Sequence, residues 1–200
     1  MGNESIKMKS EIVETFKSVI YRNKINFNNK ELLNYILKIK NKEKGRDVSN
    51  KGGWQSDDLN LNEVIINSLI KSFSPSILEF IQTLGFKSDK TFVTNLWANV
   101  NGFKDFNLTH THPGCFISGA YYIEVPKNSG NIVFHHPAED MMSADWSSNQ
   151  NIEYNSYNGL TYRVKPDSSY LYLFPSWLKH HVEPNLSKKD RISISFNVKL

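Results

Sequence analysis

The chain has 200 residues, of which 39% are hydrophobic and 22% are charged. This composition predicts one compact globular domain and excludes a disordered or fibrous protein. The net charge of +4 comes from lysines spread along the chain, without interleaved aromatic residues, so neither a nucleic-acid surface nor a nucleic-acid partner is expected.

The single cysteine, Cys115, excludes an intramolecular disulfide. We find no apolar run of the roughly 20 residues that span a membrane. The N-terminus is too polar for a signal peptide, and these features together predict a cytoplasmic protein.

The first half of the chain is expected to be helical. Apolar residues three and four positions apart predict helices near residues 10–21 and 30–40. A third helix is expected to begin near Leu61. The Ser-Pro pair at 74–75 resembles the start of another helix, with serine as the N-cap and proline at the first helical position. Gly85 is then the expected stop signal.

A polar loop over residues 45–60 separates the second predicted helix from the third. It contains Trp54, which follows two glycines and is unusual for a plain linker. Two interpretations stay open: the ring packs the loop down onto the fold, or it forms a lip over a pocket.

From Thr91 onward, short β-rich runs alternate with turn residues. The runs are 91–100, 116–125, 131–134, 160–164, 170–174 and 191–198. Short strands at this spacing predict an antiparallel sandwich or jelly-roll barrel. The expected fold is therefore mainly β with N-terminal helices (α+β). We expect a single domain over residues 1–200, with a helical support region at 1–88 and the barrel core at 89–200.

All the histidines fall in the β-rich half as three close pairs. They are His110 and His112, His135 and His136, and His180 and His181. Residues two apart on a strand point to the same face, so His110 and His112 can aim at one point inside a barrel. From each adjacent pair, at most one member can join them. Neutral imidazole binds iron, zinc, copper and nickel. The competing interpretation is two surface histidines beside a Pro-Gly turn.

The last third of the chain adds an arginine to this pattern. His180 follows a strand that ends in a proline turn, and Arg191 opens the final strand eleven residues later. On that strand Arg191, Ser193 and Ser195 share one face. This polar face lies either in solvent or along a pocket, where the arginine could hold a dicarboxylate through a two-pronged contact.

These motifs, in their order, resemble the double-stranded β-helix core of the iron(II)- and 2-oxoglutarate-dependent oxygenases, in particular the prolyl-hydroxylase-like branch. The matching segments are His110-x-His112, Ser118-Gly119-Ala120-Tyr121-Tyr122, Ser129 to Phe134, Phe174 to His180, and Arg191-x-Ser193. Trp54 in its Gly-Gly-Trp-Gln-Ser segment, and Trp97-Ala98-Asn99, resemble a phage and bacterial group of uncharacterised oxygenases in that superfamily.

The resemblance implies Fe(II) as the metal and 2-oxoglutarate as the co-substrate. It makes His110 and His180 iron ligands. Arg191 would bind the distal carboxylate of 2-oxoglutarate, with Ser193 beside it. Tyr121 would place its hydroxyl on the same carboxylate, unless it is a core tyrosine, and Asn99 would line the pocket.

The sequence departs from the family at His112, which stands where these enzymes carry aspartate or glutamate. Three neutral ligands leave the full +2 charge of the ion and strengthen its hold on an anionic co-substrate. The reserve ligands for the third position are Glu124, Glu139, Asp140 and His135. Halogenases of the superfamily have a small residue at this position to admit halide. Histidine would fill that space, so hydroxylation is expected in place of halogenation.

The expected activity is hydroxylation of an unactivated carbon with release of succinate and CO2. The partners are then O2, 2-oxoglutarate and an unidentified substrate, with no membrane. Trp177, Phe174 and Tyr122 are suited to an apolar pocket wall or to the core. One alternative is a cupin-like dioxygenase with three-histidine iron and no 2-oxoglutarate. The other is a non-catalytic jelly-roll binding protein, whose histidines would not converge.

Overall fold

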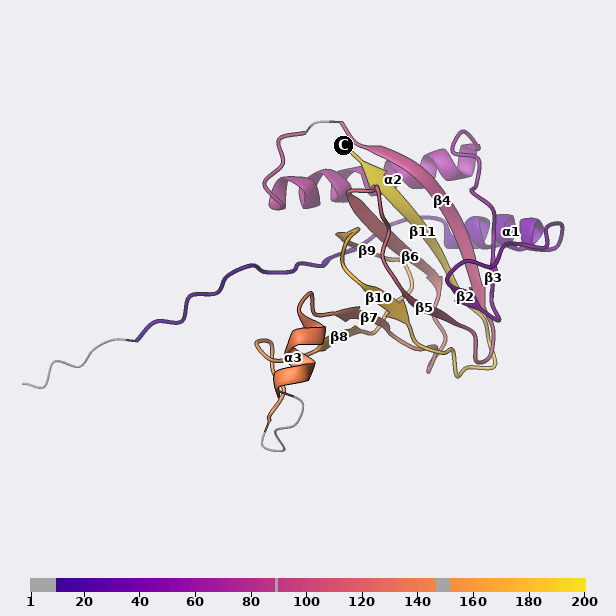
Figure 1. Ribbon diagram of the computed structural model, residues 1–200. Coiled ribbons are helices and arrows are strands. Elements are labelled where there is room, and N and C mark those ends of the chain that lie inside the picture. The colour runs from indigo at the N-terminus through magenta and orange to yellow at the C-terminus, as the bar shows by residue number, and fades with distance from the viewer. Residues whose placement is uncertain (1–9, 89, 147–151) are drawn as a thin grey trace, which may run out of the picture.

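The computed structural model describes residues 10–88, 90–146 and 152–200. Two antiparallel sheets face each other, and two helices lie against the outer face of the larger sheet (Figure 1). The larger sheet has the strand order β1-β9-β6-β11-β4-β3, and the smaller has the order β2-β5-β10-β7-β8. The strands of the larger sheet are β1 (Tyr21–Lys24), β3 (Trp54–Gln55), β4 (Phe92–Asn101), β6 (Ile117–Glu124), β9 (Tyr170–Pro175) and β11 (Arg191–Lys199). Those of the smaller are β2 (Asn50–Lys51), β5 (Phe106–His110), β7 (Ile132–His135), β8 (Thr161–Val164) and β10 (His180–Val182). The helices are α1 (Asn29–Lys40), α2 (Val64–Thr83) and α3 (Glu139–Trp146). The predicted barrel with helices on its outside is confirmed.

The strand β11 lies in the middle of the larger sheet, between β4 and β6. Its apolar residues, such as Ile194 and Phe196, belong to the hydrophobic core that the sheet forms with α1 and α2. Arg191, Ser193 and Ser195 line the space between the two sheets. The alternation of apolar and polar residues therefore places the main core on one side of this sheet and a polar pocket on the other.

Helix α2 continues through Pro75. The prediction that a separate helix begins at the Ser-Pro pair is therefore wrong. An interior proline removes one backbone hydrogen bond and costs about 3 kcal/mol. The buried stripe of α2 nevertheless runs on from Phe73 to Ile77 and Phe80, and its packing against the sheet offsets that cost. Gly85 follows the helix with φ of +85°, which confirms it as the stop.

By length and composition, α2 also reaches the threshold for a membrane span, with a mean hydropathy of 1.3. The expectation that no run reaches this length was therefore wrong. In the structure, Ile66, Leu69 and Ile81 of this helix are fully buried in the core. The apolar character of α2 thus reflects its packing against the larger sheet.

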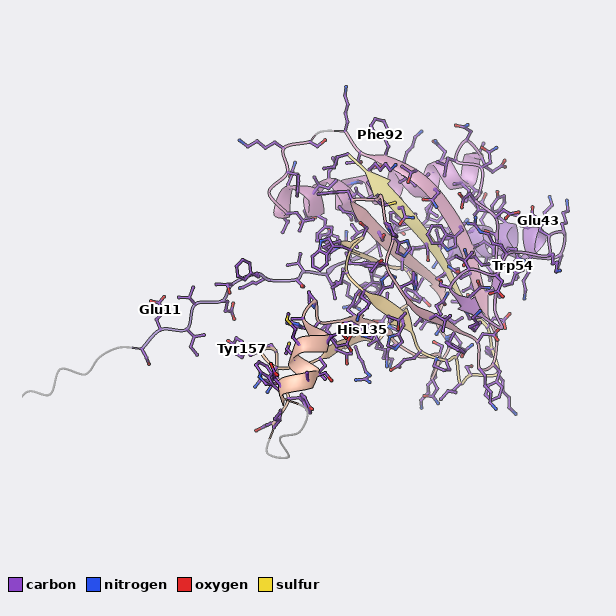
Figure 2. The ribbon with its side chains drawn as sticks, viewed as in Figure 1. Glu11, Glu43, Trp54, Phe92, His135 and Tyr157 are labelled. Atoms are coloured by element: carbon purple, nitrogen blue, oxygen red, sulfur yellow. The ribbon has the colours of Figure 1, made fainter. Side chains whose placement is uncertain are left out.

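The predicted helix at residues 10–21 is not present. Residues 10–20 have no regular structure, and Tyr21 begins β1, which pairs with β9 at the edge of the larger sheet. Figure 2 shows Glu11 on a segment that stretches away from the sheets. Ile12 and Phe16 are exposed, and a short amphipathic helix is marginal when its apolar face finds no surface to cover.

The support region predicted at residues 1–88 is not purely helical, because it also supplies β1, β2 and β3. The first nine residues and residue 89 of the predicted division lie outside the described residues.

Trp54 holds the 45–60 loop against the fold. Its indole N–H donates to the carbonyl of Glu43 at 3.0 Å (Figure 2), and its ring packs on the main core. It does not line the pocket between the sheets. These contacts support the tethering interpretation over a lip.

Candidate metal centre

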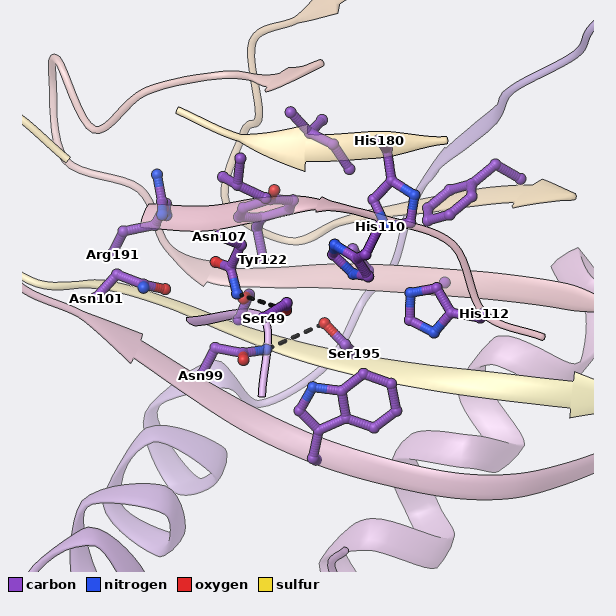
Figure 3. A pocket seen from close by; sticks show the side chains of 17 residues that line it. Ser49, Asn99, Asn101, Asn107, His110, His112, Tyr122, His180, Arg191 and Ser195 are labelled. Carbon is purple, nitrogen blue, oxygen red and sulfur yellow. Dashed lines mark hydrogen bonds between the residues drawn. The ribbon is translucent and has the colours of Figure 1, made fainter. Parts of the chain in front are cut away.

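Three histidines meet between the sheets, at the end of the pocket opposite Arg191 (Figure 3). β5 ends at His110, His112 follows two residues later, and His180 opens β10 directly opposite His110 in the sheet register. One ring nitrogen of each lies within 4.8 Å of the others, so the group could hold a metal ion. The predicted convergence is therefore present, although β5 ends before His112.

The hydrogen bonds of two of these rings fix which nitrogen is free. Nδ1 of His110 lies 2.7 Å from the carbonyl oxygen of Leu108, and Nδ1 of His180 lies 2.9 Å from that of Leu178. A carbonyl only accepts, so each Nδ1 must carry the proton and donate. Nε2 of each ring then keeps its lone pair for a metal ion, and a backbone carbonyl that holds the other nitrogen in this way is typical of metal-binding histidines.

Burial keeps the rings neutral. Desolvation lowers the pKa of His180 to about 3 and, together with the nearby His110, lowers that of His112 to about 4. The pKa of His110 is also lowered by burial. A neutral imidazole is the form that binds a metal, so this cluster needs no proton release at neutral pH.

These pKa values predict that the metal-free protein loses stability in mild acid. In the unfolded chain the rings protonate near pH 6.5, whereas in the fold the pKa of each ring is lower, to about 4 for His112 and about 3 for His180. The unfolded state therefore binds more protons, and the free energy of unfolding falls as the pH drops below about 6.5, by up to about 1.4 kcal/mol per pH unit for each ring. Chemical denaturation between pH 7.5 and 5, above the range in which carboxylates protonate, measures this slope. His112→Gln should reduce the slope by the share of one ring, and an unchanged slope would contradict the assignment.

Neither His135 nor His136 joins the cluster, and from the other adjacent pair His181 stays outside it. His135 and His181 bond to each other, with 2.8 Å between Nε2 of His135 and Nδ1 of His181. Nδ1 of His135 also contacts Glu139, which pairs with Lys179 at 3.0 Å. His135 and Glu139 are thus engaged in a separate network beside α3.

None of the reserve ligands joins the three histidines. Glu124 lies exposed at the end of β6, and Asp140 is exposed on α3. Within the described part of the chain, the cluster is made of histidines alone. Among the described residues, the geometry therefore favours His112 over a carboxylate for the third position.

Arg191 lies at the other end of the same pocket and is 1% exposed. Its Nη1 donates to the carbonyls of Ser129 and Glu183, whereas Nη2 has no partner. Among the described residues, no carboxylate forms an ion pair with it. Burial lowers the pKa of the guanidinium, but an arginine side chain stays charged. A buried charge without a counter-ion is costly, so this end of the pocket is suited to an anion.

The wall between the two ends combines apolar side chains, such as Ile132 and Val182, with polar ones. Asn99, Asn101, Ser193 and Tyr122 line it, and the side chains of Asn99 and Asn101 each have one polar atom without a partner. Asn99 and Ser193 therefore lie in the predicted pocket. The cavity itself measures about 40 Å³, so a five-carbon dicarboxylate requires some of these side chains to rotate.

Tyr121 does not face this pocket, contrary to its predicted role. Its hydroxyl donates to Asn29 of α1 at 2.6 Å, and its ring packs on Phe73 of α2. Adjacent strand residues point to opposite faces, and Tyr122 is the tyrosine that lines the pocket. Ile117 and Ile123 lie an even number of residues from Tyr121 and belong to the helix-side core, so the alternation along β6 could have revealed this placement.

One protein family, described as "Putative 2OG-Fe(II) oxygenase", has a model that matches residues 95–197, more than half of the chain. The chain belongs to this family. It is a 2-oxoglutarate-dependent oxygenase, with Fe(II) as its cofactor and 2-oxoglutarate as its co-substrate. A search of curated proteins finds no match to the sequence.

Solved structures share the fold of this oxygenase. A prolyl-4-hydroxylase from Pseudomonas putida superposes with a TM-score of 0.64 at 12% identity, covering 91% of this chain and 92% of its own. The α-ketoglutarate-dependent epimerase SnoN of nogalamycin biosynthesis gives 0.65 at 13% identity, covering 90% and 78%. HygX from Streptomyces hygroscopicus, solved with nickel and 2-oxoglutarate bound, gives 0.59 at 9% identity, covering 90% and 82%. These likenesses identify the fold of the oxygenase as a double-stranded β-helix.

Proposed function

We propose that this oxygenase hydroxylates an unactivated carbon, with His110, His112 and His180 as its iron ligands and Arg191 as the anchor for 2-oxoglutarate. One observation carries the proposal: three neutral imidazoles and an incompletely paired guanidinium occupy opposite ends of one pocket. The first group has the donor chemistry for a divalent transition metal. The second has the charge and the free donor for a carboxylate.

The ligand set determines the charge that the co-substrate meets. Because all three side chains are neutral, they leave the +2 charge of the ion uncompensated. Arg191 adds a positive charge at the other end of the pocket. A dianion between the two ends would offset two of these three positive charges, which supports 2-oxoglutarate as the molecule held there. His112 also occupies the ligand position that would have to be open for halide, so hydroxylation is favoured over halogenation.

The protein's own side chains would bind and orient the co-substrate and would exclude water from the metal centre. Tyr122 lies beside Arg191 in the pocket, and burial raises its pKa to about 12, so its hydroxyl stays protonated and can donate to a carboxylate. Phe174 packs edge-on against His180, with ring centroids 4.6 Å apart, and shields one side of that ring from solvent. When bound, iron and 2-oxoglutarate supply the oxygen-activating chemistry that forms succinate and CO2.

Anaerobic titration tests this proposal. Fe(II) is added to the protein first and 2-oxoglutarate second, while the metal-to-ligand charge-transfer absorption of the chelate is followed. We expect the band to appear only when both are present and to saturate at one equivalent of iron. Admission of O2 should then release succinate. The absence of a band with wild-type protein that has bound iron would rule out the proposed co-substrate site.

A further inference from the structure

A second hollow, the outer groove, adjoins the metal centre. It encloses about 510 Å³, and its walls include Val19, Phe86, Phe116, Trp177 and Lys17. His112 lines both this groove and the inner pocket, at the end of the pocket away from Arg191 (Figure 3). A molecule in the groove therefore lies next to a proposed iron ligand, on the side opposite the co-substrate anchor.

The walls of the groove are mainly aromatic and apolar. Phe86 and Phe116 meet edge to face, with ring centroids 4.4 Å apart. Trp177 comes from the turn between β9 and β10, which a hydrogen bond from the Leu178 amide to the Pro175 carbonyl closes at 2.9 Å. Trp177 is 56% exposed and Phe86 is 44% exposed. Large aromatic side chains that stay open to one hollow of this size are typical of small-molecule sites.

No carboxylate lines the groove among the described residues, and the charged side chain that does, Lys17, is paired with Glu14. The net charge at the groove is therefore determined mainly by the adjoining metal centre. At the adjoining metal centre, the ion (+2) and Arg191 (+1) would keep a net charge of about +1 after a 2-oxoglutarate dianion binds, because the three histidines are neutral. A cationic ligand would therefore be repelled, whereas a neutral or anionic ligand would not.

We propose that the outer groove binds the primary substrate, and that this substrate is a small molecule with an apolar ring that stacks on Trp177 and Phe86 and with no positive charge. This inference rests on the proposed function, because it takes the metal at the three histidines as the place where the substrate is oxidised.

Ligand-observed NMR with three matched probes tests the inference. The probes are 2-naphthylacetate, 2-naphthylacetamide and 2-(2-naphthyl)ethylamine, each added to full-length protein loaded with 2-oxoglutarate and either Zn(II) or Co(II). Both ions bind imidazole, but only Co(II) is paramagnetic. We expect the anion and the amide to bind at least tenfold more tightly than the amine. Their ring signals should be shifted or broadened in the Co(II) sample only.

Point variants locate the site. Trp177→Ala and Phe86→Ala should each weaken binding of 2-naphthylacetate at least tenfold. Tyr162→Ala is the matched control, because Tyr162 is an aromatic residue of β8 that is 66% exposed and does not line the groove; this variant should bind like wild type. Equal binding by the Trp177 variant, or tightest binding by the amine, would overturn the inference.

The signals of 2-oxoglutarate in the same samples separate the two proposals. If Co(II) perturbs 2-oxoglutarate but not the naphthyl probes, the groove inference fails while the proposed function stands. If Co(II) does not perturb 2-oxoglutarate, the proposed function fails and the groove inference falls with it.

Discussion

Replacement of His180 by alanine is expected to abolish stoichiometric iron binding. His180 is the most deeply buried of the three histidines, and its Nδ1 contact with Leu178 directs Nε2 toward the other two rings. Its loss leaves two ligands. Because changes even to groups behind the ligands weaken metal affinity by about 10- to 100-fold, we expect removal of a ligand to weaken it by more than roughly 100-fold. Iron content after gel filtration, and competition with a chromophoric chelator, measure the effect.

His181→Ala provides the matched control for this experiment. His181 is the next residue on β10, but its ring bonds to His135 in the network beside α3. We expect this variant to keep iron affinity within a few-fold of wild type. Retention of one equivalent of iron by His180→Ala, or equal loss in both variants, would remove His180 from the ligand set.

Replacement of Arg191 by alanine is expected to weaken 2-oxoglutarate binding and to leave iron binding intact. Truncating one partner of a buried charge pair costs about 2–5 kcal/mol, which corresponds to at least about a 30-fold rise in Kd. The charge-transfer band should therefore appear only at much higher 2-oxoglutarate concentration. Arg191→Lys should recover only part of the affinity, because an ammonium group cannot form the two-pronged contact.

Arg163→Ala is the control for Arg191→Ala. It removes a nearby positive charge but keeps Arg191, the proposed anchor. Arg163 lies on β8 with an exposed side chain and pairs with Glu183, whose backbone carbonyl also accepts from Arg191. We expect its removal to change the Kd for 2-oxoglutarate by less than about twofold, because exposed ion pairs contribute little. Thermal unfolding of every variant checks that the fold is retained. A band that forms at the wild-type concentration in Arg191→Ala would disprove the assigned anchor.

The β-rich half of this fold could be predicted well from the sequence, because alternation along a strand reports directly which face is buried. The alternation predicts Arg191, Ser193 and Ser195 on one face of the last strand, and the structure has them along the pocket. The convergence of His110 with His180 required the resemblance as well, since no local pattern indicates that β5 and β10 pair. Both strands are short, and neither has a clear strand pattern in the sequence.

The errors have three different causes. Residues 10–20 have the spacing of an amphipathic helix, but Ile12 and Phe16 are exposed without a surface to pack on. Pro75 is a strong local signal for a helix start, yet the buried face of α2 continues through it. Tyr121 was assigned from family position alone, whereas the apolar alternation of β6 assigns it to the helix side.

The central strand β11 serves two requirements at once. One set of its side chains fills the core against the helices, and the interleaved set begins with Arg191, the proposed co-substrate anchor. A slip of one residue in its pairing would exchange the two sets, exposing the guanidinium to the aliphatic core and turning isoleucines toward the pocket. Insertions or deletions within β11 should therefore abolish folding and activity together, so that this strand can vary by substitution but not in length.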